Sequence, residues 1–182
     1  MDADRAPAAP APAGPFGAFV VVAFVEPTPV GQPFSKHSWP LHVTLLRFDA
    51  PPDEALVAVG RAFARDEGAI PIRVAGEAHF GYRGRVRVSL VEHAPALQAL
   101  HERLLAEVSS VVGAIGGRVH SPQHTGEGFR PHVTVQGERR VHRGDRVLLE
   151  DFALVDMAPD GDTSVRVVVA EWRSGASRPG PA

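Results

Sequence analysis

The chain has 182 residues, 44% of them hydrophobic and none of them cysteine, and its formal net charge is −2. This length and hydrophobic fraction suffice for one compact domain with its own core. The lack of cysteine excludes disulfides, thiolate metal sites and a cysteine nucleophile. The charge argues against a protein that coats nucleic acid nonspecifically, because such binding needs an excess of Lys and Arg.

The N-terminal part of the chain divides into a tail and an apolar run. Residues 1–15 are rich in Ala and Pro and lack periodicity, which predicts a disordered tail. The run FGAFVVVAFV, residues 16–25, has the length of a secretory signal core, but acidic residues precede it and no clear cleavage site follows. Its Val and Phe content favours a buried strand, and it is too short to span a membrane. We therefore expect a cytoplasmic protein without membrane association.

The next segments alternate between irregular and regular structure. Residues 26–40 contain four prolines, which exclude a regular helix, and LHVTLLRF at 41–48 predicts a strand. Residues 51–69 begin with proline and acidic residues and predict an amphipathic helix. Its apolar positions are Leu56, Val59 and Phe63. Strands are expected at 70–80 and 85–92, with the turn signal GYRG between them.

The second half of the chain contains the most regular helix and further strands. Residues 94–117 carry apolar residues on one face and end in two glycines. The face consists of Leu97, Leu100, Leu104, Val108, Val111 and Ile115. A polar loop, a strand at the second HVT and two strands within 146–157 and 163–172 follow, and residues 174–182 predict a second tail. This order predicts an α+β protein with a largely antiparallel sheet, formed by one domain at 16–173.

One short motif occurs twice, as LHVT around His42 and as PHVT around His132. Both copies have Val after His, an aromatic residue three positions before it and a proline just upstream. On a strand, side chains alternate between faces, so the His and Thr of each copy share a face. The repetition indicates two similar lobes and a shared functional origin. The first copy thus pairs His42 with Thr44, and the second copy pairs His132 with Thr134.

Two imidazoles and two hydroxyls in one cleft suit a particular chemistry. Histidine has an unperturbed pKa near 6.5, so one ring of a pair can take a proton from water while the other donates one to a leaving oxygen. The hydroxyls would donate hydrogen bonds to the non-bridging oxygens of a phosphodiester. Without a metal ion to polarise phosphorus, the best substrate brings its own activation, as a strained 2',3'-cyclic phosphate does.

With these motifs and the helix LQALHERLLAEV before the second one, the chain resembles the two-histidine phosphoesterase superfamily from about Phe16 to Trp172. That superfamily includes the RNA 2',3'-cyclic phosphodiesterases often labelled 2'-5' RNA ligases. The resemblance implies a bilobal α+β fold, in which two pseudo-symmetric lobes of mainly antiparallel sheet, with outer helices, enclose a central cleft. It also implies metal-independent hydrolysis of 2',3'-cyclic phosphates without a cofactor, and 2'-5' RNA ligation as a related activity.

The resemblance assigns roles to the motif residues. His42 and His132 become the acid and base, and Thr44 and Thr134 bind phosphate. The residues leave open which histidine is which, and in the hydrolytic direction we assign His132 as the base and His42 as the acid. The implied partner is an RNA 3' end or a small cyclic nucleotide phosphate, and we expect a monomer.

Several residues are candidates for additional contacts to the substrate. Arg130 lies two residues before His132, and Pro131 favours the extended backbone that would put both side chains on the cleft face, so Arg130 is a candidate phosphate ligand. The alternative is a solvated arginine. Arg83, Arg85 and Arg87 alternate along the expected strand and predict either a basic stripe or a solvent-facing sheet surface. Four aromatic residues are candidates for base stacking or for core packing: Phe34, Trp39, Tyr82 and Phe129.

Other functions compete with this hypothesis. His120 and His124 suggest a histidine metalloenzyme, but Pro122 between them excludes helical spacing and no cysteine or carboxylate pair completes a ligand set. We expect no metal site and favour a mobile loop beside the cleft. A non-catalytic RNA or nucleotide-binding protein of the same fold is the second alternative, and substrate-dependent binding without turnover would identify it.

Overall fold

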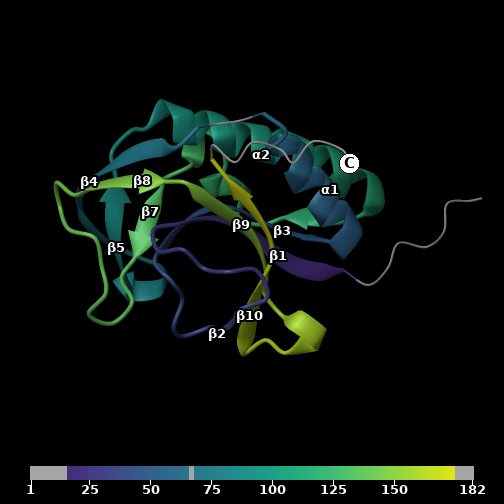
Figure 1. Cartoon of the computed structure of the whole chain (residues 1–182), viewed down its shortest axis with the longest axis horizontal. Helices are drawn as coiled ribbons and strands as arrows, with labels where there is room; N and C mark the ends of the chain where they lie inside the picture. Colours follow the sequence, from purple (N-terminus) through teal and green to yellow (C-terminus); the bar gives the residue numbers. More distant parts are fainter. Residues whose placement is uncertain (1–15, 66–67, 175–182) are drawn as a thin grey trace, which may run out of the picture.

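The protein is an α+β fold built on one curled antiparallel sheet (Figure 1). The computed structural model describes residues 16–65 and 68–174, so the two expected tails lie outside the described residues, apart from Ser174. The helices are α1 (Pro52–Ala62) and α2 (Pro95–Ile115). The strands are β1 (Gly17–Phe24), β2 (Pro33–Ser35), β3 (His42–Ala50), β4 (Ile70–Phe80), β5 (Val86–Val91), β6 (Arg118–Val119), β7 (His132–Thr134), β8 (Arg146–Leu149), β9 (Asp151–Asp156) and β10 (Val165–Arg173).

The sheet joins two groups of strands at the two motif strands. Its order is β2-β10-β9-β1-β3-β7-β5-β4-β8, with β6 pairing with β3 at the side. The pairings between these strands are antiparallel. β3 and β7 meet in a short ladder with Val43 opposite Val133. The two copies of the motif, far apart in the sequence, are therefore neighbours at the centre of the sheet.

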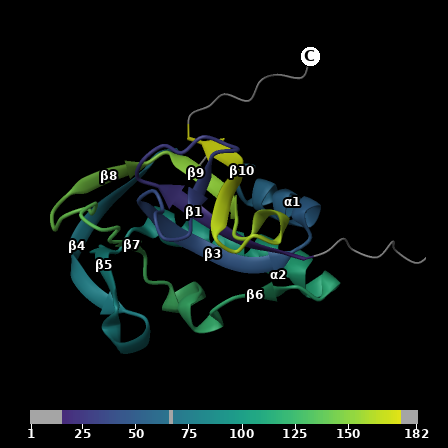
Figure 2. The ribbon, with the colours of Figure 1, turned by 90° about the horizontal axis from the view of Figure 1, so that it is seen from below.

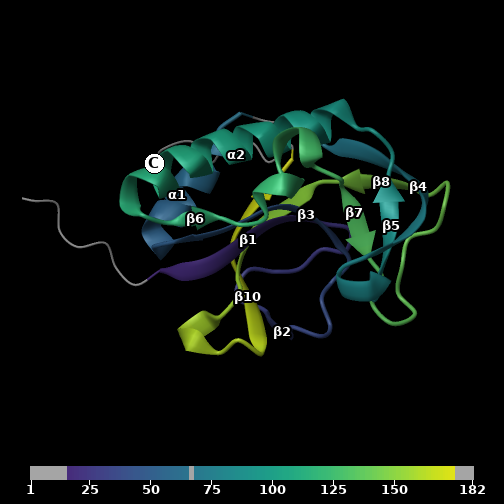
Figure 3. The ribbon, with the colours of Figure 1, turned by 180° about the vertical axis from the view of Figure 1, so that it is seen from behind.

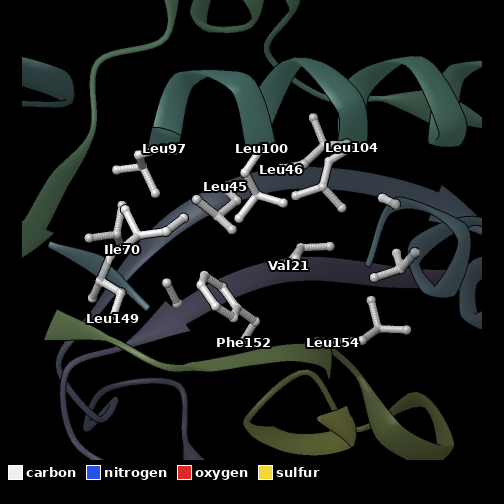
Figure 4. Close-up of a cluster of buried hydrophobic side chains, with 14 of the residues drawn as sticks. Val21, Leu45, Leu46, Ile70, Leu97, Leu100, Leu104, Leu149, Phe152 and Leu154 are labelled. Atoms are coloured by element: carbon white, nitrogen blue, oxygen red, sulfur yellow. The ribbon is translucent and has the colours of Figure 1, made fainter. Parts of the chain in front are cut away.

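Both helices cover one face of the sheet, and the main core lies between the helices and this face (Figure 3). The first four positions of the apolar face predicted for α2 are confirmed, since Leu97, Leu100 and Leu104 are fully buried above β3 and β1 (Figure 4) and Val108 is buried as well. Near the end of the helix Val112 is buried in place of the predicted Val111 and Ile115, which are only partly buried. The helix ends at Gly116, whose φ of 79° is a conformation that glycine adopts without strain. Neither helix of the described chain combines the length and apolar content that a membrane span requires.

The face predicted for α1 is wrong in one respect. Leu56 is 38% exposed, and the buried side of the helix consists of Ala55, Ala58, Val59 and Ala62. Several apolar faces compete in this segment, and the alanine face allows the helix to approach its neighbours most closely. Phe63, just after the helix, packs on Phe152 and Trp172 with ring centroids 5.3 and 5.0 Å apart.

The other face of the sheet carries a smaller apolar cluster beneath the proline-rich segment. The cluster consists of Val20, Val22, Phe24, Trp39, Ala153, Val155 and Val168. As the prolines predict, residues 26–40 form no helix, and their one strand, β2, pairs with the edge of β10. Figure 2 shows the curl of the sheet and the segment from β6 to β7 that crosses below it.

Candidate active site

The two motif strands place four polar side chains on one face of the sheet. Val43 and Val133 lie opposite each other and are fully buried in the main core. Residues on either side of them point to the opposite face, and in an antiparallel register Thr44 then lies across from His132 and His42 across from Thr134. The two histidines form a diagonal pair, for which Cβ atoms lie roughly 7 Å apart.

Both imidazoles are held in the same way. The Nδ1–H of His42 donates to the carbonyl of Pro40 at 2.7 Å, and that of His132 donates to the carbonyl of Arg130 at 2.8 Å. A carbonyl only accepts, so Nδ1 must carry the proton and Nε2 of the neutral ring is left with a lone pair. Each copy of the motif therefore presents one Nε2 that is free to accept a proton.

His42 occupies the more enclosed of the two positions. Its ring lies 4.7 Å from that of Trp39 and meets that of Phe24 edge-on at 6.3 Å. Burial lowers the pKa of His42 to about 4, and repulsion from His132 acts in the same direction, against the bond to the Pro40 carbonyl. In the free protein at neutral pH this ring is uncharged.

His132 faces the open side of the site. Its ring meets Phe80 edge-on at 4.9 Å. Burial lowers the pKa of His132, the bond to the Arg130 carbonyl opposes this shift, and the charges of the Arg130 guanidinium and of His124 add to the lowering. His132 is therefore also biased toward the neutral form, in which it can act as a base.

A pocket of about 420 Å³ opens beside His132 and Thr44. Its walls come from β3 with Arg47, from the end of β4 with Phe80 and Gly81, and from the loop of residues 120–130, which we call the pocket loop. This volume falls in the range of small-molecule sites. His42 and Thr134 lie next to this space and do not line it.

The pocket loop is fastened to α2 through a histidine that sequence reasoning missed. His101 is fully buried; its Nδ1–H donates to the carbonyl of Leu45 at 2.7 Å, and its Nε2 accepts from the Gly126 N–H at 2.8 Å. Phe129 stacks on the His101 ring at 4.0 Å between centroids, and Gln98 donates to the Gly126 carbonyl at 3.0 Å. The signal in the sequence was a histidine within the leucine face of α2.

His101 must be neutral to make both of these bonds, because a protonated ring has no acceptor. Burial lowers the pKa of His101, while the bond to the Leu45 carbonyl and the attraction of Glu102 oppose this shift. The net lowering of the pKa favours the neutral form. The ring joins β3, next to Thr44, to the pocket loop. It thus positions one wall of the pocket relative to the motif strands.

Of the residues suggested as additional contacts to the substrate, the structure places some at the pocket or on the surface and packs others against protein. Arg130 is exposed, lines the pocket and lies with its guanidinium carbon 5.3 Å from the centroid of Phe80. Trp39 and Phe34 pack on each other at 4.9 Å, so these two aromatic residues take the core-packing role, whereas Phe129 packs on His101 and also lines the pocket. Tyr82, by contrast, is 73% exposed.

Arg83, Arg85 and Arg87 do not alternate along one strand, so as a set they form neither of the two predicted arrangements, a basic stripe or a solvent-facing sheet surface. The turn is longer than GYRG indicated: a single 3₁₀ turn spans Tyr82–Gly84, and β5 begins only at Val86. Leu90 pairs with His132, so by alternation Arg87 lies on the face opposite the histidines. The first two arginines lie on the turn at the rim of the pocket.

His120 and His124, the two histidines of the metal hypothesis, have different surroundings. His120 contacts the Asp49 carboxylate through Nε2 at 2.8 Å, and both His120 and His124 line the pocket. Within residues 16–65 and 68–174, no three His, Cys, Asp or Glu side chains gather as a metal site would require.

A curled antiparallel sheet with paired His-x-Thr strands at its centre is the arrangement that the resemblance to the two-histidine phosphoesterase superfamily implied. The family model of the 2'-5' RNA ligase superfamily matches residues 31–156, and the chain belongs to this superfamily. No curated protein matches it.

Solved structures share the fold. The protein TT0787 of Thermus thermophilus is 24% identical, with a TM-score of 0.58, over 86% of this chain and 97% of that chain. A protein described as a phosphoesterase is 14% identical, with a TM-score of 0.57, over 88% and 98% of the two chains. LigT of E. coli, crystallised with 3'-AMP, is 12% identical, with a TM-score of 0.54, over 88% and 98%.

Proposed function

We propose that this protein hydrolyses 2',3'-cyclic phosphates, at RNA ends or on small nucleotides, by an acid/base mechanism that uses His42 and His132 and no cofactor. One observation carries the proposal: the two imidazoles share a face of adjacent strands, each with Nδ1 bonded to a carbonyl and Nε2 free. LigT has been crystallised with 3'-AMP, ATP and NADP+, which are phosphate-bearing nucleotides.

In the proposed reaction the positions of the two rings relative to the pocket assign the proton movements. His132 lines the pocket that water can enter, so its Nε2 takes a proton as the water oxygen attacks phosphorus. The bond from phosphorus to one ribose oxygen breaks, and Nε2 of the more enclosed His42 donates a proton to that oxygen. Exchange of one proton with solvent restores the starting state. Ring strain in the cyclic phosphate favours this hydrolytic direction over ligation.

The remaining motif residues stabilise the charge on phosphate. The hydroxyls of Thr44 and Thr134 lie across the two strands from the histidines and donate to the non-bridging oxygens as negative charge develops there. Arg130, at the pocket wall, adds a guanidinium that can bind phosphate oxygens. A substrate phosphate thus has donors on both of the strands that hold the acid and the base.

The direct test is an assay of purified, chelator-treated protein with a panel of nucleoside 2',3'-cyclic phosphates and short RNAs that end in one. We expect ring opening to a single regioisomer, since one ribose oxygen faces the acid. If chelation abolishes turnover and added metal restores it, the two-histidine mechanism is wrong. Binding without any product would identify a non-catalytic nucleotide-binding protein.

The lowered pKa values of His42 and His132 predict how kcat/KM depends on pH. The active form has one proton shared by the histidine pair, which titrates as a unit with two pKa values. The pKa of His42 is lowered to about 4 and that of His132 is lowered below its usual 6.5, so this form is most abundant above about pH 4 and below the pKa of His132. Its reactive arrangement, with the proton on His42, is the minor one in the free protein. We expect kcat/KM to be highest in this pH range and to fall as the pH rises further.

The profile of kcat provides the control. A bound phosphate anion favours the protonated rings, so the maximum of kcat should lie at higher pH than that of kcat/KM. Both profiles are measured with a nucleoside 2',3'-cyclic phosphate, whose phosphate does not titrate in this range. A kcat/KM that increases from acidic to mildly alkaline pH would contradict the assigned environments.

A further inference from the structure

The turn between β4 and β5 exposes an aromatic side chain at the rim of the pocket. Tyr82 is 73% exposed. It directly follows Phe80 and Gly81, which line the pocket, and the Phe80 ring contacts His132. Phe34 and Trp39, which the sequence also suggested for stacking, pack on each other, and Phe129 packs on His101 at the pocket wall, whereas Tyr82 is largely exposed.

Two arginines accompany this ring. The guanidinium carbons of Arg83 and Arg85 lie 5.1 and 6.0 Å from the ring centroid of Tyr82. The ion pairs of the described chain involve neither of them, nor Arg130 at the adjacent wall. On a protein with a formal net charge of −2, these cations create a local positive surface that continues from the pocket.

The backbone holds the turn in an unusual conformation. Gly81, Arg83 and Gly84 all have positive φ, at 71°, 55° and 66°. For Arg83 this conformation has a cost of about 1 kcal/mol or more, and such residues are concentrated where a binding site uses them. The backbone that carries Tyr82 and Arg83 is therefore held in a strained conformation next to the pocket.

We propose that Tyr82, Arg83 and Arg85 form a subsite for the nucleotide that precedes the 3'-terminal one in a single-stranded RNA. Its base stacks on Tyr82, and the two guanidiniums contact the phosphodiester that joins it to the terminal nucleotide. This proposal rests on the proposed function, because a 2',3'-cyclic phosphate occupies the 3' end of a chain and further nucleotides extend only from its 5' side. The pocket holds the terminal nucleotide, and the next one lies over the rim.

Binding of RNA provides a test that does not depend on turnover. A labelled single-stranded tetranucleotide ending in a 3'-phosphate is titrated with wild-type protein and with Tyr82→Ala, Tyr82→Phe and Arg61→Ala, and fluorescence anisotropy is followed. Loss of one stacked base weakens binding about 5- to 100-fold, so this is the expected effect of Tyr82→Ala. Tyr82→Phe keeps the ring and should bind like wild type, as should Arg61→Ala, which changes an exposed arginine of α1.

Kinetics separate this proposal from the proposed function. The measured quantity is the ratio of kcat/KM for a tetranucleotide 2',3'-cyclic phosphate to that for a mononucleotide, and Tyr82→Ala should lower it by the same factor as binding. If Tyr82→Ala binds RNA like wild type, the subsite is refuted even when mononucleotides are hydrolysed. If no cyclic phosphate is opened but RNA binding still requires Tyr82, the proposed function fails and the subsite stands.

Discussion

Replacing His132 with alanine is expected to lower kcat for 2',3'-cyclic phosphate hydrolysis by about 10²- to 10⁴-fold, and replacing His42 should have an effect of the same order. Each variant loses one of the two Nε2 atoms that face the same phosphate. Steady-state rates with a mononucleotide 2',3'-cyclic phosphate measure the loss. Because both rings act in one step, the double variant should be only slightly slower than either single variant.

A matched control is available on the same sheet. His79 is an exposed strand histidine on β4, paired with Arg87, on the face opposite His132. His79→Ala should therefore turn over substrate like wild type. Rates within threefold of wild type for His42→Ala or His132→Ala, in a folded protein, would remove that residue from the mechanism.

Replacing His101 with alanine is expected to lower the free energy of unfolding by about 2–5 kcal/mol, the largest effect on stability that we predict. The variant leaves a cavity in the core and unpaired groups at Leu45 and Gly126. Urea denaturation measures the change. His101→Phe keeps most of the volume and a ring to stack on Phe129 but loses both hydrogen bonds, so it should lose about 1–3 kcal/mol.

The pH dependence of stability distinguishes the hydrogen-bonding role of His101 from simple packing. Its pKa is lowered in the folded protein, so the unfolded chain binds a proton more readily, and stability falls as the pH falls below about 6.5. His42 and His132 contribute with the same sign. In His101→Phe the slope should be shallower than in wild type and still present. An unchanged slope would show that His101 titrates normally in the folded protein.

The sequence was most informative where one pattern dominates. The leucines of α2 share one face, and two glycines follow the helix, so the leucine positions and the end of the helix were predicted correctly. The repeated HVT motif specified two strands with His and Thr on one face, and the antiparallel pairing of β3 with β7 then brings them together. Composition and the four prolines likewise indicated the irregular segment before β3.

Prediction failed where local patterns were ambiguous or where tertiary contacts decide. In α1, large and small apolar residues offer alternative faces, and packing selected the alanines over Leu56. At Arg83 and Arg85, a turn longer than expected changed which side chains alternate. The role of His101 depends on a loop 25 residues later in the chain, a contact that helical periodicity cannot reveal.

The short ladder at Val43 and Val133 also ties correct folding to activity. A slip of one residue between β3 and β7 would turn one histidine toward the leucines of α2 and bring a valine out in its place. Such a chain would have to bury an imidazole in an apolar layer, at a large energetic penalty. The misaligned register is therefore less stable than the aligned one. Folded molecules thus have both histidines on the same face of the sheet.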